Sequence, residues 1–217
     1  MNATMSNIHL ELLGPSHQKI FTKLGQFRDV GYLAGGTALM LQIQHRKSVD
    51  FDVFIRHAMD NRFRLSVEKV FGKQNLEVNS EDQITFSPQS STAVTFLWYY
   101  WKPLRPLIST EALPLASIED IAADKAHTLG RRAVWRDYVD LFYLLKHHGM
   151  TASTIIEAAR KKFGGDFVKE QFLEQLSYFG DLEIVPVDYV QRSYTPEEIQ
   201  SFLKNQVKTY LTRILPV

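Results

Sequence analysis

The sequence predicts an α+β protein in which a mixed sheet flanked by helices precedes a helical C-terminal part. Residues 32–55 read as strand, glycine turn, helix and strand. Three short runs rich in β-branched and aromatic residues follow at 76–78, 83–87 and 93–98. From residue 117 onward, apolar residues recur at helical spacing. We therefore expect an α/β core over residues 1–115 and a helical part over 116–217 packed on that core.

Local signals bound each expected element of the core in turn. Gly14 and Pro15 separate a short helix within 1–13 from a second helix over 16–28, which Ser16 caps. A glycine turn and Thr37, as the N-cap, start a helix over 38–44, and a strand over 49–55 follows. A helix over 61–71 ends at Gly72, and a turn at 88–91 joins the last two strands into a hairpin.

The expected C-terminal helices also have recognisable starts and stops. A Ser-x-x-Asp capping box at 117–120 opens a helix over 118–129, and a second helix over 133–148 stops at Gly149. Thr151 or Ser153 caps a helix that ends near 163, and Asp166 caps the next one. Residues 183–194 are expected to be mostly loop, and Thr195 with Pro196 opens the last helix.

The amino-acid composition excludes some classes of protein and of metal site but does not indicate a binding partner. The 217 residues carry a formal net charge of +1, so any nucleic-acid contact must come from local patches. The chain has no cysteine, which excludes disulfides and thiolate metal sites. No stretch approaches the roughly 20 apolar residues of a membrane span, and the N-terminus lacks the pattern of a signal peptide. We expect a cytoplasmic protein without a membrane partner.

The glycine turn at residues 35–36 is the first candidate binding element. Glycine permits positive φ and lets the backbone approach a ligand closely. The N–H groups at the start of the following helix suit an anion such as a phosphate. We interpret Gly35, Gly36 and Thr37 as a phosphate cradle.

Two carboxylates on the next strand are the candidate metal ligands. Asp50 and Asp52 alternate with apolar residues, so both point to one face of the strand while Phe51 and Val53 point to the core. Mg²⁺ needs only one or two carboxylates when substrate phosphates supply further oxygens. A lone Asp-x-Asp is more often a pair of solvent-facing residues on an edge strand. The neighbouring glycine turn favours the metal site.

Lys125 and two aspartates form a second candidate group. Lys125 interrupts an apolar helical stripe, so it must snorkel to solvent, pair with a carboxylate or reach into a cleft. Asp137 and Asp140 are neighbours on one side of the next helix, where Arg136 is spaced to pair with Asp140. The alternative is an exposed, salt-bridged helix face. A functional site requires Lys125, with Arg131 or Arg132, to face these carboxylates.

An aromatic and basic segment over 99–106 has two interpretations. Its rings and cations could stack on a base and contact phosphate. Alternatively, the prolines fix a connection whose rings cover the sheet. The sequence favours the second interpretation.

These motifs together resemble the AbiEii/AbiGii toxin family, which belongs to the polymerase-β-like nucleotidyltransferase superfamily. Gly-Gly-Thr-Ala-Leu at 35–39, His-Arg-x-Ser-x-Asp-x-Asp at 45–52, Lys125 and Arg-Asp-x-x-Asp at 136–140 carry the resemblance, which covers roughly residues 30–146. It implies a polymerase-β-like nucleotidyltransferase core and Mg²⁺-dependent transfer of a nucleotidyl group from a nucleoside triphosphate (NTP). The implied acceptors are an RNA or transfer-RNA end or a protein, and the implied protein partner is a cognate antitoxin.

The resemblance also assigns roles to individual residues. It implies that Asp50 and Asp52 bind the metal and act in catalysis together with Lys125 and Asp137, and that Asp140 is a structural partner. The residues that it implies for NTP binding are Gly35, Gly36, Thr37, Arg46, Ser48 and Lys125.

Two rival interpretations stay open, and a departure from the superfamily pattern motivates the first. The superfamily often has a third carboxylate on a strand in the region of 92–98, and this chain has none there. One rival is a catalytically degenerate module that binds a nucleotide or a partner. The other is a helical scaffold whose sheet merely resembles the superfamily.

Overall fold

A computed structural model describes residues 8–89 and 92–214. Most of the expected helix over 1–13, and the second half of the expected turn at 88–91, lie outside the described residues. The chain divides into two compact units, Met1–Ser117 and Ile118–Val217, which are described separately below.

The first unit is built on a five-stranded mixed sheet with the strand order β1-β2-β5-β4-β3. The strands are β1 (Gly31–Ala34), β2 (Phe51–Ile55), β3 (Leu76–Asn79), β4 (Gln83–Gln89) and β5 (Thr92–Trp98). β2 runs parallel to β5, and the other neighbouring pairs are antiparallel. The expected α+β class with a mixed sheet is confirmed.

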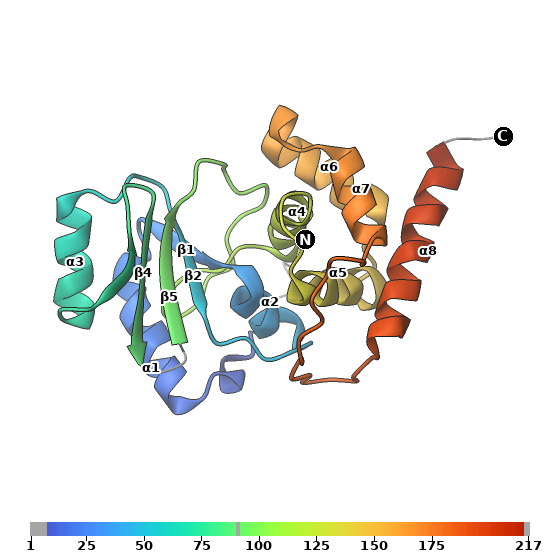
Figure 1. Ribbon diagram of the computed structural model, residues 1–217. Helices are drawn as coiled ribbons and strands as arrows, with labels where there is room; N and C mark the ends of the chain where they lie inside the picture. Colours follow the sequence, from blue (N-terminus) through green and yellow to red (C-terminus); the bar gives the residue numbers. More distant parts are fainter. Residues whose placement is uncertain (1–7, 90–91, 215–217) are drawn as a thin grey trace, which may run out of the picture. The chain divides into compact units, whose positions relative to one another are not determined.

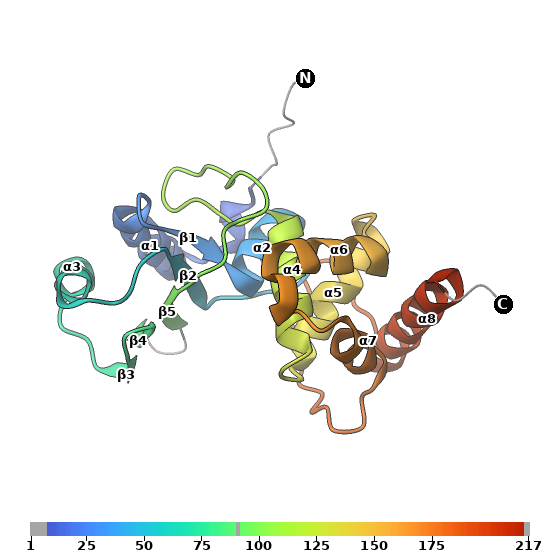
Figure 2. The same ribbon diagram turned by 90° about the horizontal axis from the view of Figure 1, so that it is seen from above.

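Two helices cover one face of this sheet, α1 (Pro15–Leu24) and α3 (Asn61–Phe71) (Figures 1 and 2). Phe51, Val53 and Ile55 alternate along β2 and are fully buried. Phe21 of α1 packs on Phe51 with 6.3 Å between ring centroids. The aromatic and β-branched side chains of β2 therefore form the core with the two helices, as their alternation predicts.

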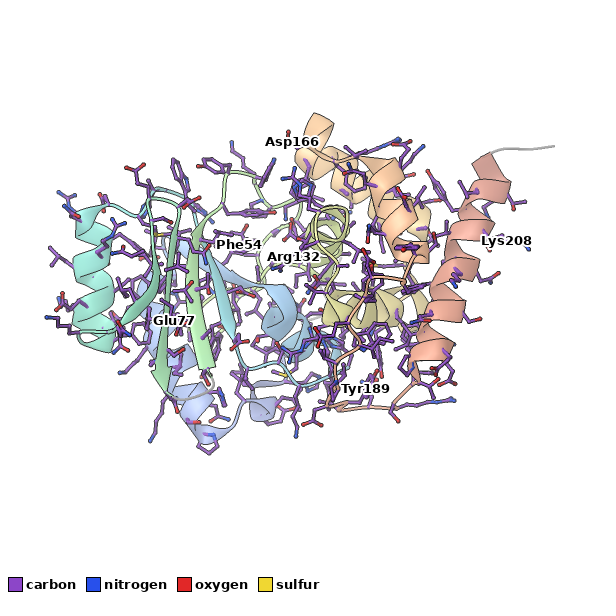
Figure 3. All side chains as sticks on the ribbon, in the orientation of Figure 1. Phe54, Glu77, Arg132, Asp166, Tyr189 and Lys208 are labelled. Atoms are coloured by element: carbon purple, nitrogen blue, oxygen red, sulfur yellow. The ribbon has the colours of Figure 1, made fainter. Side chains whose placement is uncertain are left out.

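The opposite face of the sheet carries Asp52 and Phe54, which alternate with the core residues of β2. Tyr99 stacks on Phe54, which Figure 3 labels, with 4.0 Å between their ring centroids. This contact confirms for Tyr99 the expectation that the aromatic segment covers the sheet. Tyr100 differs, because 64% of its surface is exposed.

Three short elements complete the first unit: η1 (Leu10–Leu12), η2 (Gly25–Phe27) and α2 (Gly35–Ile43). The expected single helix over 16–28 is in fact α1 followed by η2, and α1 starts at Pro15 after Gly14 instead of being capped by Ser16. The backbone of Leu33 in β1 also bonds to Pro114 and Ala116, so the later chain covers the outer edge of this strand.

The second unit consists of helices. They are α4 (Ile118–Leu129), α5 (Trp135–His147), α6 (Ala152–Phe163), η3 (Gly164–Asp166), α7 (Lys169–Ser177) and α8 (Pro196–Ile214) (Figure 1). Thr151 caps α6, and Thr195 exchanges capping hydrogen bonds with Glu198 at the start of α8, as expected. The prediction that Asp166 caps the next helix is wrong, because Asp166 ends η3 and α7 begins after Val168. None of the described helices has the length and hydropathy needed to span a membrane.

Candidate active site

The glycine turn is packed directly against candidate ligand-binding side chains of the first unit. Gly35 opens α2 directly after β1 with φ at +66°, a conformation that favours glycine. A methyl group on Gly35 would collide with the Asp52 carboxylate. On Gly36 it would lie 2.7 Å from Arg46 Nη2 and 3.0 Å from Ser48 Oγ. Glycine is therefore required at both positions, because the Asp52 carboxylate lies against Gly35 and the Arg46 guanidinium and Ser48 hydroxyl lie against Gly36.

Thr37 has a different role from the one expected. The helix starts at Gly35 with Ala34 as its N-cap, so the prediction that Thr37 caps it is wrong. The Thr37 hydroxyl instead donates to the Asp50 carbonyl oxygen and lies 3.0 Å from Ser48 Oγ. Thr37 is 1% exposed. It therefore ties the first turn of α2 to the segment that carries the candidate metal ligands.

The two aspartates sit at the start of β2 and engage different neighbours. The strand begins at Phe51, two residues later than expected, so Asp50 lies just before it. Asp50 is exposed, and its Oδ1 accepts a 2.9 Å hydrogen bond from the Ala93 N–H of β5. Asp52 pairs with Ala34 of β1 in the sheet, which brings its carboxylate to the glycine turn.

Arg46 is the buried cation of this group. Only 3% of its surface is exposed, and its Nη1 donates to the Lys47 carbonyl at 3.2 Å. Its Nη2 faces Gly36. A fixed guanidinium beside a glycine backbone is suited to bind phosphate oxygens, since its planar fork of donors matches their geometry.

The chemistry of the donor set fits Mg²⁺. The Asp52 carboxylate beside the glycine turn, with Asp50 two residues before it, offers the oxygen ligands that this ion uses when substrate phosphates complete its shell. No third carboxylate joins them from β5, because Thr95 occupies the position paired with Asp52. Thr95 lies 3.2 Å from Thr85 of β4, hydroxyl to hydroxyl. Over residues 8–89 and 92–214, no three His, Cys, Asp or Glu residues are grouped to hold a metal without substrate.

In the second unit, Lys125 of α4 binds the carboxylates of Asp137 and Asp140 of α5. Its Nζ lies 2.7 Å from Asp140 Oδ2 and also bonds to Asp137 Oδ1. All three residues are buried, with exposed fractions of 9% or less. Of the alternatives for Lys125, pairing is observed. The alternative interpretation of the aspartates, an exposed helix face, is wrong, because α4 covers them.

Asp137 keeps one oxygen available within this group. Its Oδ2 is buried and has no hydrogen-bond partner in the part of the chain that the structure describes. Tyr138 beside it remains a phenol, because burial, with the nearby charges of Asp181 and Asp137, raises its pKa to about 12. Asp137 is therefore the better candidate for accepting a proton or a hydrogen bond.

None of the three arginines near this group takes a place beside the aspartates. Arg131 is exposed and donates to the Asp166 carbonyl at 3.4 Å. Arg132 and Arg136 are exposed as well. Asp140 is bound by Lys125 instead of the expected Arg136, because α5 turns the aspartates toward α4.

A second buried cluster was missed by sequence reasoning. Lys162 of α6 lies 3.0 Å from Asp120 Oδ1 and 2.6 Å from Asp124 Oδ1 of α4. Lys162 and Asp120 are buried, with exposed fractions of 7% and 0%. The signal was present, because Lys162 continues the apolar stripe of Ile155 and Ala159 in α6. Only the packing of α4 against α6 shows which carboxylates it meets.

Comparison with known proteins gives this geometry a context. The family model described as "Nucleotidyl transferase AbiEii toxin, Type IV TA system" matches residues 94–212, which is more than half of the chain. The match includes Lys125, Asp137 and Asp140 and begins after the glycine turn and Asp52. An uncharacterized Aquifex aeolicus protein, aq_aa25, is 27% identical over 194 residues, covering 83% of this chain and 87% of that protein.

Two solved structures show the same fold. MenT4, a nucleotidyltransferase toxin from Mycobacterium tuberculosis, aligns with a TM-score of 0.64 over 88% of this chain and 80% of that chain, at 16% identity. A candidate nucleotidyltransferase from H. pylori aligns with a TM-score of 0.56 over 94% of this chain and 100% of that chain, at 16% identity. The chain belongs to the AbiEii family of nucleotidyltransferases, the toxins of type IV toxin–antitoxin systems.

Proposed function

We propose that the protein transfers a nucleotidyl group from an NTP to an acceptor in a Mg²⁺-dependent reaction. The observation that carries the proposal is the convergence of Asp52, Arg46 and Ser48 on the glycine turn. The acceptor is proposed to be an RNA or transfer-RNA end or a protein side chain, and the physiological partner a cognate antitoxin.

The residues of the first unit supply binding and charge. Backbone N–H groups of the glycine turn bind the β- and γ-phosphates, since the start of α2 offers free donors. Arg46 orients the phosphates, and Ser48 bonds to them or braces the turn. Asp50 and Asp52 hold the metal. When bound, Mg²⁺ neutralises the triphosphate and lowers the pKa of the acceptor hydroxyl.

The reaction is a displacement at the α-phosphorus. The acceptor oxygen forms a bond to that phosphorus while the bond to the bridging oxygen breaks, and pyrophosphate leaves. Asp137, whose carboxylate Lys125 binds, is proposed as an acceptor-side base that takes this proton or as a brace, the roles that the family resemblance implies. Lys125 is also proposed to contact the triphosphate or ribose. Asp140 is proposed as a structural partner, because its carboxylate also binds the Lys125 ammonium.

Transfer from radiolabelled NTPs to total RNA and to protein, with Mg²⁺, tests the proposal. Asp52→Asn and Asp50→Asn are each expected to lower transfer by about 10² to 10³-fold, the cost of removing one group that stabilises developing charge. The matched control is Asp82→Asn, at an exposed aspartate of the same unit outside the site. Full activity in Asp52→Asn would refute the assignment of the metal ligands.

The degenerate binding module is the second candidate function. It is favoured by Thr95, which stands beside Asp52 where a third carboxylate would complete the metal site. This candidate predicts that the protein binds Mg²⁺ and NTP, measured by calorimetry, but transfers nothing to any acceptor. Transfer that Asp52→Asn abolishes would exclude it.

A further inference from the structure

A broad groove lies between α1 and α3 on the helix-covered face of the first unit. It has a volume of about 880 Å³. The residues that define this basic groove are Lys23, Phe27, Arg62, Phe63, Ser66 and Lys69. Its volume falls at the upper end of the roughly 300–1,000 Å³ of ligand pockets.

The floor of the basic groove is apolar, and its two phenylalanine rings are not open to solvent. Phe27 and Phe63 are 3% and 5% exposed. Both rings pack on Phe96 of the sheet, with centroids 4.9 and 5.3 Å away. Bases stack on exposed rings, so the two phenylalanines are poorly suited to hold single-stranded nucleic acid, although the exposed His57 ring also lines the groove. The floor suits aliphatic side chains, which need contact area without stacking geometry.

The rim of the basic groove is cationic. Lys23, Arg62 and Lys69 are exposed around it. Asp60 is the single carboxylate among the described residues that line it. The Asp60 carboxylate already caps α3 by accepting a 2.7 Å hydrogen bond from the Phe63 N–H. The rim therefore presents an excess of positive charge over an apolar floor.

The spacing of the rim residues suits a helix. Arg62, Ser66 and Lys69 lie at i, i+4 and i+7 along α3, so they follow one side of the groove for roughly 10 Å at 1.5 Å per residue. That is about two helical turns, the length over which a bound amphipathic helix presents its i, i+4 and i+7 anchors.

We infer that the basic groove binds an acidic amphipathic helix of a partner protein. Leucine-like anchors of the partner fill the floor, and its carboxylates pair with Lys23, Arg62 and Lys69. Residues 1–7 of this chain do not meet these requirements, because they include no aspartate or glutamate.

The basic groove is separate from the proposed active site. Phe51 and Val53 of β2 face the same side of the sheet as α1 and α3, whereas Asp52 between them faces the opposite side. Partner binding therefore does not depend on nucleotidyl transfer. Asp52→Asn is expected to bind the partner helix like the wild type, so the two proposals can fail independently.

Fluorescence anisotropy tests the inference on the full-length protein. The probe is a synthetic fluorescein-labelled peptide that is amphipathic as a helix, with leucines on one face and glutamates flanking them. The wild type is expected to bind this peptide. A version with glutamine in place of glutamate is expected to bind at least about tenfold more weakly, because the small contributions of several rim charge pairs are lost together. Added salt is expected to weaken binding of the acidic peptide.

Two variants test whether the peptide binds in the basic groove or is attracted only by the overall positive charge of the protein. Lys23→Glu with Lys69→Glu reverses two rim charges and is expected to weaken binding at least about tenfold. Ser66→Trp keeps every rim charge but fills the floor, and is expected to do the same. The matched control is Lys161→Glu with Lys208→Glu, two exposed lysines of the second unit, which is expected to bind like the wild type (Lys208 is labelled in Figure 3).

Three outcomes would overturn the inference. The first is no binding of the acidic peptide to the wild type. The second is equal binding by the wild type and the variant with Lys23→Glu and Lys69→Glu, which folds on circular dichroism. The third is a wild-type dimer in analytical ultracentrifugation that this double variant makes monomeric, which would assign the groove to a second copy of the chain.

Discussion

At Gly36, a single added methyl group tests whether the glycine turn binds phosphate. Gly36→Ala places a Cβ 2.7 Å from Arg46 Nη2 and 3.0 Å from Ser48 Oγ, so the guanidinium must shift. We expect the affinity for MgATP or another NTP to fall by about tenfold or more, because a phosphate-binding group is displaced. Calorimetric titration measures the affinity.

Gly165→Ala is the matched control for this prediction. Its added Cβ meets no atom within 4 Å, so NTP affinity is expected to stay at the wild-type value. Unchanged affinity in Gly36→Ala, with the fold intact, would contradict the proposed role of the turn.

At the scale of elements, buried charge joins the helices of the second unit. Lys162 fastens α6 to α4 through Asp120 and Asp124. Lys162→Met would remove this cation from two carboxylates in a buried setting. We expect the free energy of unfolding to fall by about 3–5 kcal/mol, the usual cost of breaking a buried ion pair from one side. Urea denaturation followed by circular dichroism measures this change.

A compensating variant distinguishes charge from packing. Adding Asp120→Asn and Asp124→Asn to Lys162→Met removes the uncompensated negative charge and is expected to restore part of the lost stability. No restoration in the triple variant would mean that the packing of the lysine stem, instead of its charge, determines the loss.

For the whole molecule, the enzyme hypothesis and the scaffold hypothesis predict different responses to ligand. A ligand that binds only the folded chain stabilises it by about 2.7 kcal/mol at a concentration of 100 times its Kd. Thermal unfolding is therefore expected to shift upward with NTP and Mg²⁺ together, and to shift less in Asp52→Asn. If the melting temperature of the wild type is the same with and without NTP and Mg²⁺, the result would favour a scaffold that only shares the fold.

The strands and most helix starts could be predicted because their signals are local. Alternation marks the strands, and Asp60, Thr151 and Thr195 each cap the helix that follows within a few residues. Thr37 shows the limit of such reasoning. Its type and position fit a cap, but its hydroxyl bonds to Asp50, thirteen positions away.

The sequence by itself determined the α+β class, the order of the elements and the candidate motifs, because hydrophobic period and turn chemistry depend on near neighbours. Only the tertiary structure decided that Lys125 binds Asp137 and Asp140, that Lys162 meets Asp120 and Asp124, and that Thr95 stands beside Asp52. The physical reason is that helix packing and strand register select partners far apart in the chain. A buried charge shows that it needs a partner without showing which one it finds.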